Sequence, residues 1–84
     1  MNTIHWTPKA ARQLRKQPAT HQVTIRDAVG DLAAFPDCVG VKRLTDHRYS
    51  YRLRVGRYRV FFEFDGVIRL IEIKEVKKRD DHTY

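Results

Sequence analysis

Three consecutive stretches in the second half of the chain, residues 49–55, 57–64 and 67–76, alternate apolar and polar side chains with the period of two typical of a β-strand. Asp65-Gly66 is a strong signal for a two-residue hairpin, and Val55-Gly56 is a weaker turn. Parallel strands need long crossover connections, whereas these connections are short. The pattern therefore predicts a three-stranded antiparallel meander.

The first half of the chain carries the signals of a short strand followed by a helix. Residues 3–6 are typical of a strand. Thr7-Pro8 indicates a helix start, because threonine caps a helix and proline fits its first position. We expect this helix to end near Gln17, before Pro18.

A second helix is expected from a cap at Thr20 to Phe35, where Pro36 ends it. An i, i+4, i+7, i+8 pattern predicts its core-facing stripe. The stripe consists of Ile25, Val29, Leu32 and Ala33. Residues 41–44 are expected to form a lead-in strand or an extended loop. The order β-α-α-β-β-β predicts a single α+β domain over residues 1–84, with a helical hairpin on one face of a mostly antiparallel sheet.

Four arginines lie within ten residues of the predicted meander. They are Arg52, Arg54, Arg57 and Arg59. Alternation along the strands places Arg52, Arg54 and Arg59 on the face opposite the core. A hairpin closed on Val55-Gly56 pairs Arg54 with Arg57 and Arg52 with Arg59, and a bulge there would move Arg57 out of the set. The second hairpin pairs Arg59 with Glu72, which would hold it in place, and puts Phe61 and Leu70 on the same face as an apolar floor.

The chain is strongly basic, with 17 Lys and Arg against 10 Asp and Glu, a formal charge of +7 and a pI of about 10.0. This balance indicates a polyanion partner, namely a nucleic acid or an acidic protein that masks the same surface. A solvated face is the alternative. Repeated arginine, which contacts phosphate through two donors at once, favours nucleic-acid binding.

Several classes of protein do not fit the sequence. The single cysteine, Cys38, forms no internal disulfide, which is typical of a reducing cytoplasm. The start MNTIHWTPKAARQ lacks the apolar region of a signal peptide. No apolar run is long enough to span a membrane, so a cytoplasmic protein without membrane contact is expected.

The order of these segments resembles the RelE/ParE superfamily of bacterial toxin–antitoxin toxins, and is most similar to RelE-type mRNA interferases. The resemblance rests on the helical hairpin, VKRL at 41–44, YRLRVGRYRVFFEF at 51–64 and IEIKEVKKRDDHTY at 71–84. It implies a ribosome-dependent endoribonuclease that cuts messenger RNA by attack of the 2′-hydroxyl on the adjacent phosphate. It also implies that no metal or cofactor is used, and that a cognate antitoxin covers the toxin in a hetero-oligomer.

The resemblance also assigns site residues by position. Arg52 and Arg54 match two basic residues on the strand after the hairpin, and Arg59 matches an arginine on the next strand. Lys78 or Arg79 matches the basic residue before the terminal tyrosine, which is Tyr84 here. The other candidate RNA-binding residues are Arg57, Phe61, Lys77, Arg79, Lys42 and Arg43.

The family's lysines are arginines in this chain, and an arginine is a poor general base. His82 is the first candidate for moving the proton, Glu72 the second and His47 the third.

Two other functions use the same features. A ParE-like toxin shares the fold and inhibits DNA gyrase. A non-catalytic RNA-binding module would stack bases on Phe61 and Tyr84 without cutting the chain.

Overall fold

The computed structural model describes residues 1–79. Its helices and strands follow the predicted order, with a 3-10 turn added after the second helix. They are β1 (Thr3–Trp6), α1 (Pro8–Arg15), α2 (Ala19–Gly30), the 3-10 helix η1 (Asp31–Ala34), β2 (Val41–Arg43), β3 (Tyr51–Val55), β4 (Tyr58–Asp65) and β5 (Leu70–Lys78). The predicted α+β class is confirmed, and the lead-in segment is a short strand.

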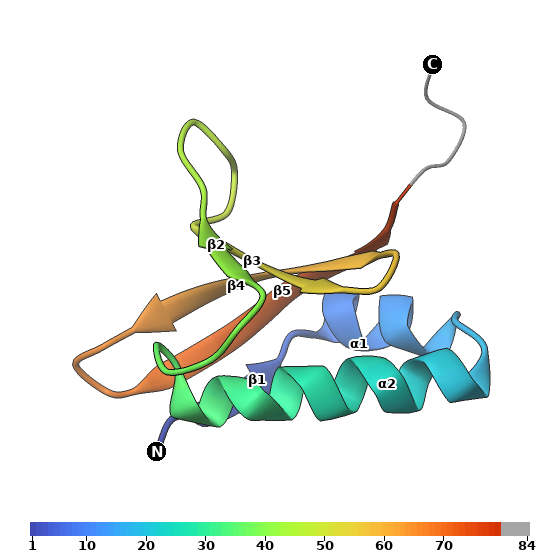
Figure 1. The fold of residues 1–84 in the computed structure, drawn as a ribbon, viewed down its shortest axis with the longest axis horizontal. Helices are drawn as coiled ribbons and strands as arrows, with labels where there is room; N and C mark the ends of the chain where they lie inside the picture. The colour runs from blue at the N-terminus through green and yellow to red at the C-terminus, as the bar shows by residue number, and fades with distance from the viewer. Residues whose placement is uncertain (80–84) are drawn as a thin grey trace.

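The strands form one mixed sheet in the order β1-β5-β4-β3-β2. The first strand, β1, runs parallel to β5, and all other neighbours are antiparallel. Figure 1 shows α1 and α2 on the same side of the sheet. We call the opposite side, which carries Arg52, Arg54, Arg59 and Phe61, the open face, because no helix of residues 1–79 covers it. No helix within residues 1–79 is long and apolar enough to cross a membrane.

The two helices begin differently. The Oγ1 atom of Thr7 accepts a hydrogen bond from the backbone N–H of Ala10 at 3.3 Å, which confirms the predicted cap of α1. The same hydroxyl donates to the carbonyl of Ile73 at 2.7 Å and ties the helix start to β5. The predicted cap at Thr20 is wrong, because α2 begins directly after Pro18 and Thr20 lies within its first turn.

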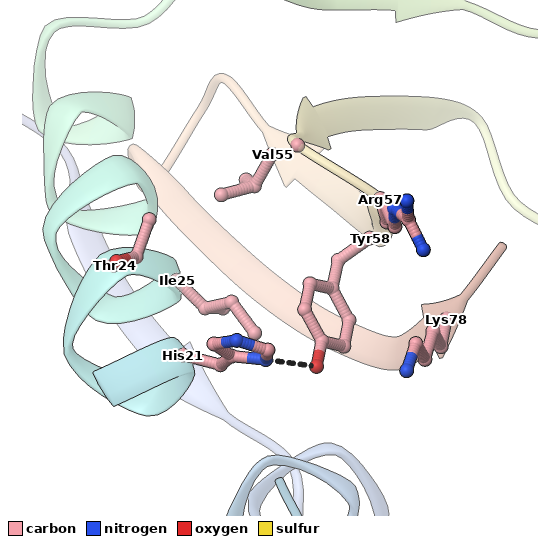
Figure 2. Close-up of a pocket in the computed structure, with 8 residues that line it drawn as sticks. His21, Thr24, Ile25, Val55, Arg57, Tyr58 and Lys78 are labelled. Atoms are coloured by element: carbon pink, nitrogen blue, oxygen red, sulfur yellow. Dashed lines mark hydrogen bonds between the residues drawn. The ribbon is translucent and has the colours of Figure 1, made fainter. Parts of the chain in front are cut away.

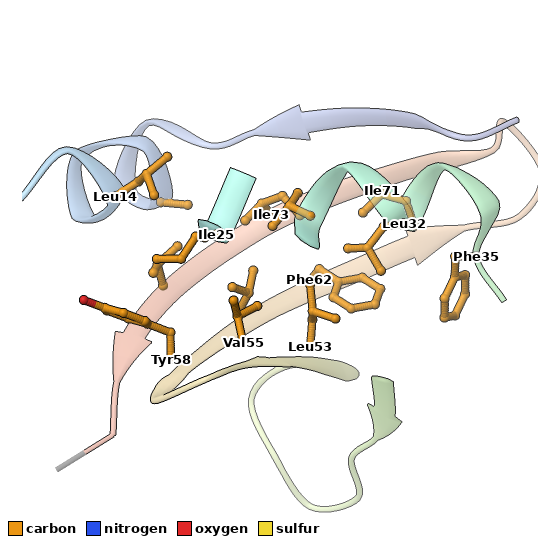
Figure 3. Packing of buried hydrophobic residues seen from close by; sticks show 14 residues of the cluster. Leu14, Ile25, Leu32, Phe35, Leu53, Val55, Tyr58, Phe62, Ile71 and Ile73 are labelled. Carbon is orange, nitrogen blue, oxygen red and sulfur yellow. The ribbon is translucent and has the colours of Figure 1, made fainter. Parts of the chain in front are cut away.

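The core lies between α2 and the covered face of the sheet (Figure 3). Its helical side contains the predicted stripe residues Ile25, Val29 and Leu32, all at most 1% exposed. Phe62 and Ile73 lie across from them and are fully buried. Burying each such side chain contributes about 1.5–3 kcal/mol, which makes this layer the main attachment of the helices to the sheet.

The β3–β4 hairpin closes one residue later than expected. Val55 pairs with Tyr58, so Gly56 and Arg57 form the turn, and Gly56 adopts the positive φ of 55° that such a turn requires. The predicted cross-strand pairs of arginines are therefore wrong. Arg54 lies opposite Arg59 instead.

The β4–β5 hairpin is not the predicted two-residue turn. Asp65 pairs with Leu70, and a four-residue loop lies between them. The Oδ1 atom of Asp65 caps this loop by accepting hydrogen bonds from the N–H groups of Val67 (2.9 Å) and Ile68 (3.4 Å). The longer loop moves β5 by four residues relative to the predicted pairing. An even shift keeps the same side chains facing the core.

An irregularity in the register follows between Phe61 and Phe62. Phe62 pairs with Ile73 and Phe61 pairs with Glu75, so β5 contains one extra residue at Lys74. After this bulge, the residues of β5 that point to the core are even-numbered instead of odd-numbered. The bulge therefore turns Val76 into the core and the following residue, Lys77, onto the open face.

Candidate nucleic-acid interface

A cleft of about 210 Å³ lies at the end of the sheet where β3 and β4 turn and β5 ends. Five arginines line it, together with Gly56 and Tyr58. They are Arg52, Arg54, Arg57, Arg59 and Arg79, and we call the cavity the arginine cleft. The backbone N–H of Arg79 donates to the carbonyl of Arg57 at 2.6 Å, which holds the end of β5 beside the turn.

Positive charge accumulates in this cleft, and no acidic side chain among residues 1–79 lines it. Arg59 faces Arg54 on one side and Lys77 on the other. Within the part of the chain that the structure describes, Arg52, Arg54 and Arg59 form no ion pair. The Nε atom of Arg52 is buried and has no hydrogen-bond partner among residues 1–79. An oxyanion bound here would accept hydrogen bonds from the exposed guanidinium groups of Arg54 and Arg59, which have no hydrogen bond or ion pair among residues 1–79.

The acid opposite Phe61 on the open face already has partners. Glu75 lies opposite Phe61, and its Oε1 atom accepts hydrogen bonds from Lys9 Nζ at 3.2 Å and Tyr49 Oη at 3.1 Å. Burial raises the pKa of Glu75. The two hydrogen bonds and the charges of Lys9 and Lys77 lower it by more than burial raises it, so the net shift of the pKa is downward. Glu75 is therefore an ionised structural group rather than a proton carrier.

Other predicted RNA-binding residues lie near the cleft. Lys42 pairs with Arg52 across β2 and β3, and Lys77 pairs with Arg59 across β5 and β4. Both extend the positive surface beyond the cleft. The bulge in β5 brings Lys77 to this face, and the sequence pattern alone does not reveal it.

Three predicted residues lie elsewhere. Arg43 pairs with Tyr51 and lies over its ring at 6.0 Å, on the covered face. Lys78 pairs with Tyr58 and is turned to the covered face as well. The predicted pairing of Glu72 with Arg59 is wrong, since Glu72 lies opposite Glu63 and forms an ion pair with Lys74 at 3.7 Å. His82 and Tyr84 lie outside the described residues.

Phe61 is on the open face, as predicted, but only 6% of it is exposed. The rings of His47 and Tyr49 cover it, with centroids at 5.0 Å and 5.6 Å and interplanar angles of 19° and 29°. Phe61 therefore cannot stack on a base directly. The covering residues come from the loop between β2 and β3, where strand alternation gives no information about which face a side chain takes.

A second pocket, of about 380 Å³, adjoins the arginine cleft on the covered face (Figure 2). Ile25 and Val55 form its apolar walls, and Tyr58 borders both pockets. His21 Nδ1 lies 2.9 Å from the hydroxyl of Tyr58, which itself donates to Gln17 Oε1 at 3.0 Å. The carboxamide accepts this proton, so the hydroxyl accepts from His21. This pocket has fewer cations than the cleft, and the cleft is the better match for phosphate.

The residues that line the arginine cleft have limited chemistry. Among residues 1–79 no histidine or carboxylate lines it. The same residues contain no group of three or more histidine, cysteine or acidic side chains arranged to hold a metal ion. The described cleft can bind an anion and stabilise developing negative charge. It has no group suited to accept a proton at neutral pH.

Comparison with known proteins gives the family. Residues 4–81 match the family model described as the ParE toxin of the type II toxin–antitoxin system parDE. No curated protein matches the chain.

Three solved structures have the same fold. A chain of the toxin–antitoxin complex RelBE2 from Mycobacterium tuberculosis is 26% identical, with a TM-score of 0.80 over 93% of this chain and 98% of that one. A chain of the RelE–RelB complex from Pyrococcus horikoshii is 21% identical, with a TM-score of 0.78 over 95% of this chain and 97% of that one. The isolated RelE toxin of E. coli is 13% identical, with a TM-score of 0.79 over 95% of this chain and 86% of that one. The match to the family model covers nearly the whole chain and these structures share its fold, so the chain belongs to the ParE toxin family, within the RelE/ParE superfamily of type II toxins.

Proposed function

We propose that this toxin is a ribosome-dependent endoribonuclease that holds a phosphodiester of messenger RNA in the arginine cleft. The observation that carries the proposal is the set of five arginines around one cleft of about 210 Å³, three of which have no acidic partner among residues 1–79. Planar guanidinium groups bind phosphate through two parallel hydrogen bonds, which lysines do not.

The cleavage needs no group outside the RNA to act as nucleophile. The 2′-hydroxyl attacks the adjacent phosphorus, the P–O5′ bond breaks, and the products carry a 2′,3′-cyclic phosphate and a 5′-hydroxyl. A base takes the proton of the 2′-hydroxyl and an acid supplies one to the leaving oxygen. Negative charge develops on the non-bridging oxygens, where Arg54 and Arg59 stabilise it by a few kcal/mol each.

Proton transfer is assigned to the end of the chain. Arginine stays protonated at any relevant pH. His82 is the proposed acid or base, and Tyr84 the proposed stacking residue. Glu72 loses its proposed supporting role, because its neighbours are Glu63 and Lys74.

A cognate antitoxin is the proposed protein partner. Homologous toxins have been crystallised in complexes with RelB. We propose a hetero-oligomer in the cytoplasm in which an acidic antitoxin segment neutralises the arginine cleft and blocks RNA.

Inhibition of DNA gyrase is the second candidate function. Two observations favour it: the family model that matches is that of ParE, and the described lining of the cleft contains no proton-transfer group. A third reading, RNA binding without cleavage, uses the same cleft.

Expression of the chain without its antitoxin, followed by mapping of RNA 5′ ends, separates these functions. The endoribonuclease produces new 5′-hydroxyl ends at a fixed position within codons, and Arg59→Ala abolishes them. Arg26→Ala, which removes an exposed arginine of α2, leaves them unchanged. Growth arrest with altered DNA supercoiling and intact RNA would overturn the proposal in favour of gyrase. RNA binding without new ends would identify a non-catalytic module.

A further inference from the structure

Three aromatic rings gather on the open face beside the arginine cleft. His47 stacks on Phe61 at 5.0 Å, and Tyr49 stacks on the same ring at 5.6 Å. His47 and Tyr49 come from the loop before β3, and Phe61 comes from β4. The loop therefore packs two aromatic side chains against one phenyl ring on the open face.

Of the three rings, His47 is the one left exposed. Phe61 is 6% exposed. Tyr49 is half-buried, with the guanidinium of Arg48 over its ring at 5.4 Å and its hydroxyl bound to Glu75. The imidazole of His47 is fixed from below by Phe61 and from the side by the N–H of Tyr49, which donates to Nδ1 at 3.0 Å. Since Nδ1 accepts in this arrangement, Nε2 is the N–H donor of the ring.

The position of this ring relates it to the cleft. Phe61, which supports His47, lies directly opposite Arg52 across β3 and β4. Arg52 lines the arginine cleft, and Lys42 lies on its other side across β2. Residues paired in this way have Cα atoms about 4.5–5.5 Å apart. The exposed imidazole therefore lies near the cleft, on the side of Arg52 and Lys42.

We infer that His47 is a stacking platform for a nucleobase of the RNA whose phosphate occupies the arginine cleft. The inference rests on the proposed RNA-binding function. A flat ring with one face already packed loses little entropy when a base stacks on the other, and such stacking tolerates any base. The surrounding Arg48, Arg52 and Lys42 favour a nucleotide over an apolar protein segment, because their charge attracts the flanking phosphates.

The test uses the full-length chain and a short RNA with 2′-O-methyl riboses, which cannot be cleaved because the attacking hydroxyl is blocked. One 2-aminopurine is placed at each position in turn, and its fluorescence falls where it stacks. A matched RNA carries an abasic residue at the quenched position. His47→Ala is compared with His47→Phe, which keeps an aromatic ring, and with His5→Ala, an exposed histidine on β1 at the other edge of the sheet.

Quenching at one position by the wild type, by His47→Phe and by His5→Ala supports the platform. His47→Ala should lose this quenching and raise the Kd by about 5-fold or more. The slope of log Kd against log salt should stay unchanged, because no phosphate contact is lost. The abasic RNA should bind wild type and His47→Ala equally. Arg59→Ala should raise the Kd for both RNAs and reduce the slope of log Kd against log salt.

Each contrary outcome has its own meaning. If His47→Ala binds and quenches like the wild type while Arg59→Ala is weakened, the platform is wrong and the RNA-binding cleft stands. If none of these RNAs binds to the wild type, the platform is overturned, because the cleft and the ring then do not hold free RNA. The proposed endoribonuclease is decided separately, by the mapping of RNA 5′ ends in cells. If His47→Ala weakens the antitoxin complex and leaves RNA binding unchanged, the ring belongs to a protein interface and the inference is overturned.

Discussion

Arg54 lies directly opposite Arg59 across β3 and β4, on the face of the sheet that no helix of residues 1–79 covers. Like charges in this position destabilise a strand pair by up to about 1 kcal/mol. Lys77 adds a third cation on the far side of Arg59. A domain of this size has a net stability of only a few kcal/mol, so this arrangement is a substantial cost. A bound anion would offset this repulsion, which explains why cations lie opposite one another at an anion-binding site.

Arg54→Gln should therefore increase the free energy of unfolding, by up to about 1 kcal/mol at low salt, while it weakens RNA binding. The gain should shrink in high salt, which screens the charges of the wild type. Urea denaturation at two salt concentrations measures it. Arg26→Gln, on the exposed side of α2, should change stability by less than about 0.5 kcal/mol. A loss of stability in Arg54→Gln at low salt would contradict the repulsion.

The faces of the meander are predictable from sequence because they depend only on alternation. Leu53 and Val60 are in the core and Arg52, Arg54 and Arg59 are opposite, as strand parity requires. The pairing of strands depends on turn length, which the sequence indicates less well. Asp65-Gly66 has the signature of a two-residue turn, but the side chain of Asp65 caps a longer loop instead.

The candidate site is predictable to a similar extent. The arginines follow from parity, whereas the position of Lys77 depends on a bulge, and a bulge has no sequence signal here. The cover on Phe61 depends on how an irregular loop folds back, which local patterns do not encode.

Asn2 should be among the residues at which a substitution that adds a charge lowers the free energy of unfolding most. Its Nδ2 atom donates to the carbonyls of Leu32 and Phe35 at 3.2 Å and 2.9 Å, and the residue is 5% exposed. Asn2→Ala removes the side-chain donor to the Phe35 carbonyl, whereas the Leu32 carbonyl keeps the N–H of Phe35 at 3.0 Å, and the change should cost about 1–3 kcal/mol. Asn2→Asp should cost more, because a buried carboxylate would face two carbonyl oxygens. Urea denaturation measures both, with the exposed Thr3→Ala as control. Equal losses in the two Asn2 variants would contradict this account.

Tyr58→Phe should lower the free energy of unfolding by about 0.5–1.5 kcal/mol, because its hydroxyl joins His21 to Gln17. Tyr51→Phe is a matched control on the neighbouring strand: its ring stacks on Phe62, and its hydroxyl has no hydrogen bond among residues 1–79. It should be nearly neutral. Thermal unfolding of both variants decides the point, and similar shifts in Tm would show that the hydroxyl network contributes nothing.

Gly40→Ala and Gly30→Ala should change stability in opposite directions. Gly40 has a φ of 82°, and its carbonyl accepts from the N–H of Arg54 at 3.0 Å. A Cβ there would lie 3.4 Å from the carbonyl oxygen of Arg54. We expect a loss of about 1–2 kcal/mol. Gly30 is helical with open space around it, and alanine should stabilise it by about 0.5–1 kcal/mol. Denaturant midpoints test this, and a gain in Gly40→Ala would refute it.

The contribution of Glu75 to stability should depend on pH. Burial raises its pKa, but the hydrogen bonds from Lys9 and Tyr49 and the charges of Lys9 and Lys77 bring the pKa below the ordinary value of 4.5. A lowered pKa means that the stabilising effect of the ionised form is complete above about 4.5 and is lost as the pH falls through the folded value. Glu75→Gln, which keeps an acceptor and loses the charge, should thus destabilise the protein at neutral pH.

The stability difference between wild type and Glu75→Gln should close in acid, as measured by urea denaturation across a pH series. Glu72→Gln is the matched control, because Glu72 is more exposed, at 39% against 15% for Glu75, and its ion pair with Lys74 is longer, at 3.7 Å. Its effect should be small at every pH, since an exposed ion pair contributes about 0–1 kcal/mol. A difference for Glu75→Gln that stayed constant from neutral pH into acid would mean that the carboxylate stabilises the fold through packing, and that its charge has no part in holding Lys9 and Tyr49.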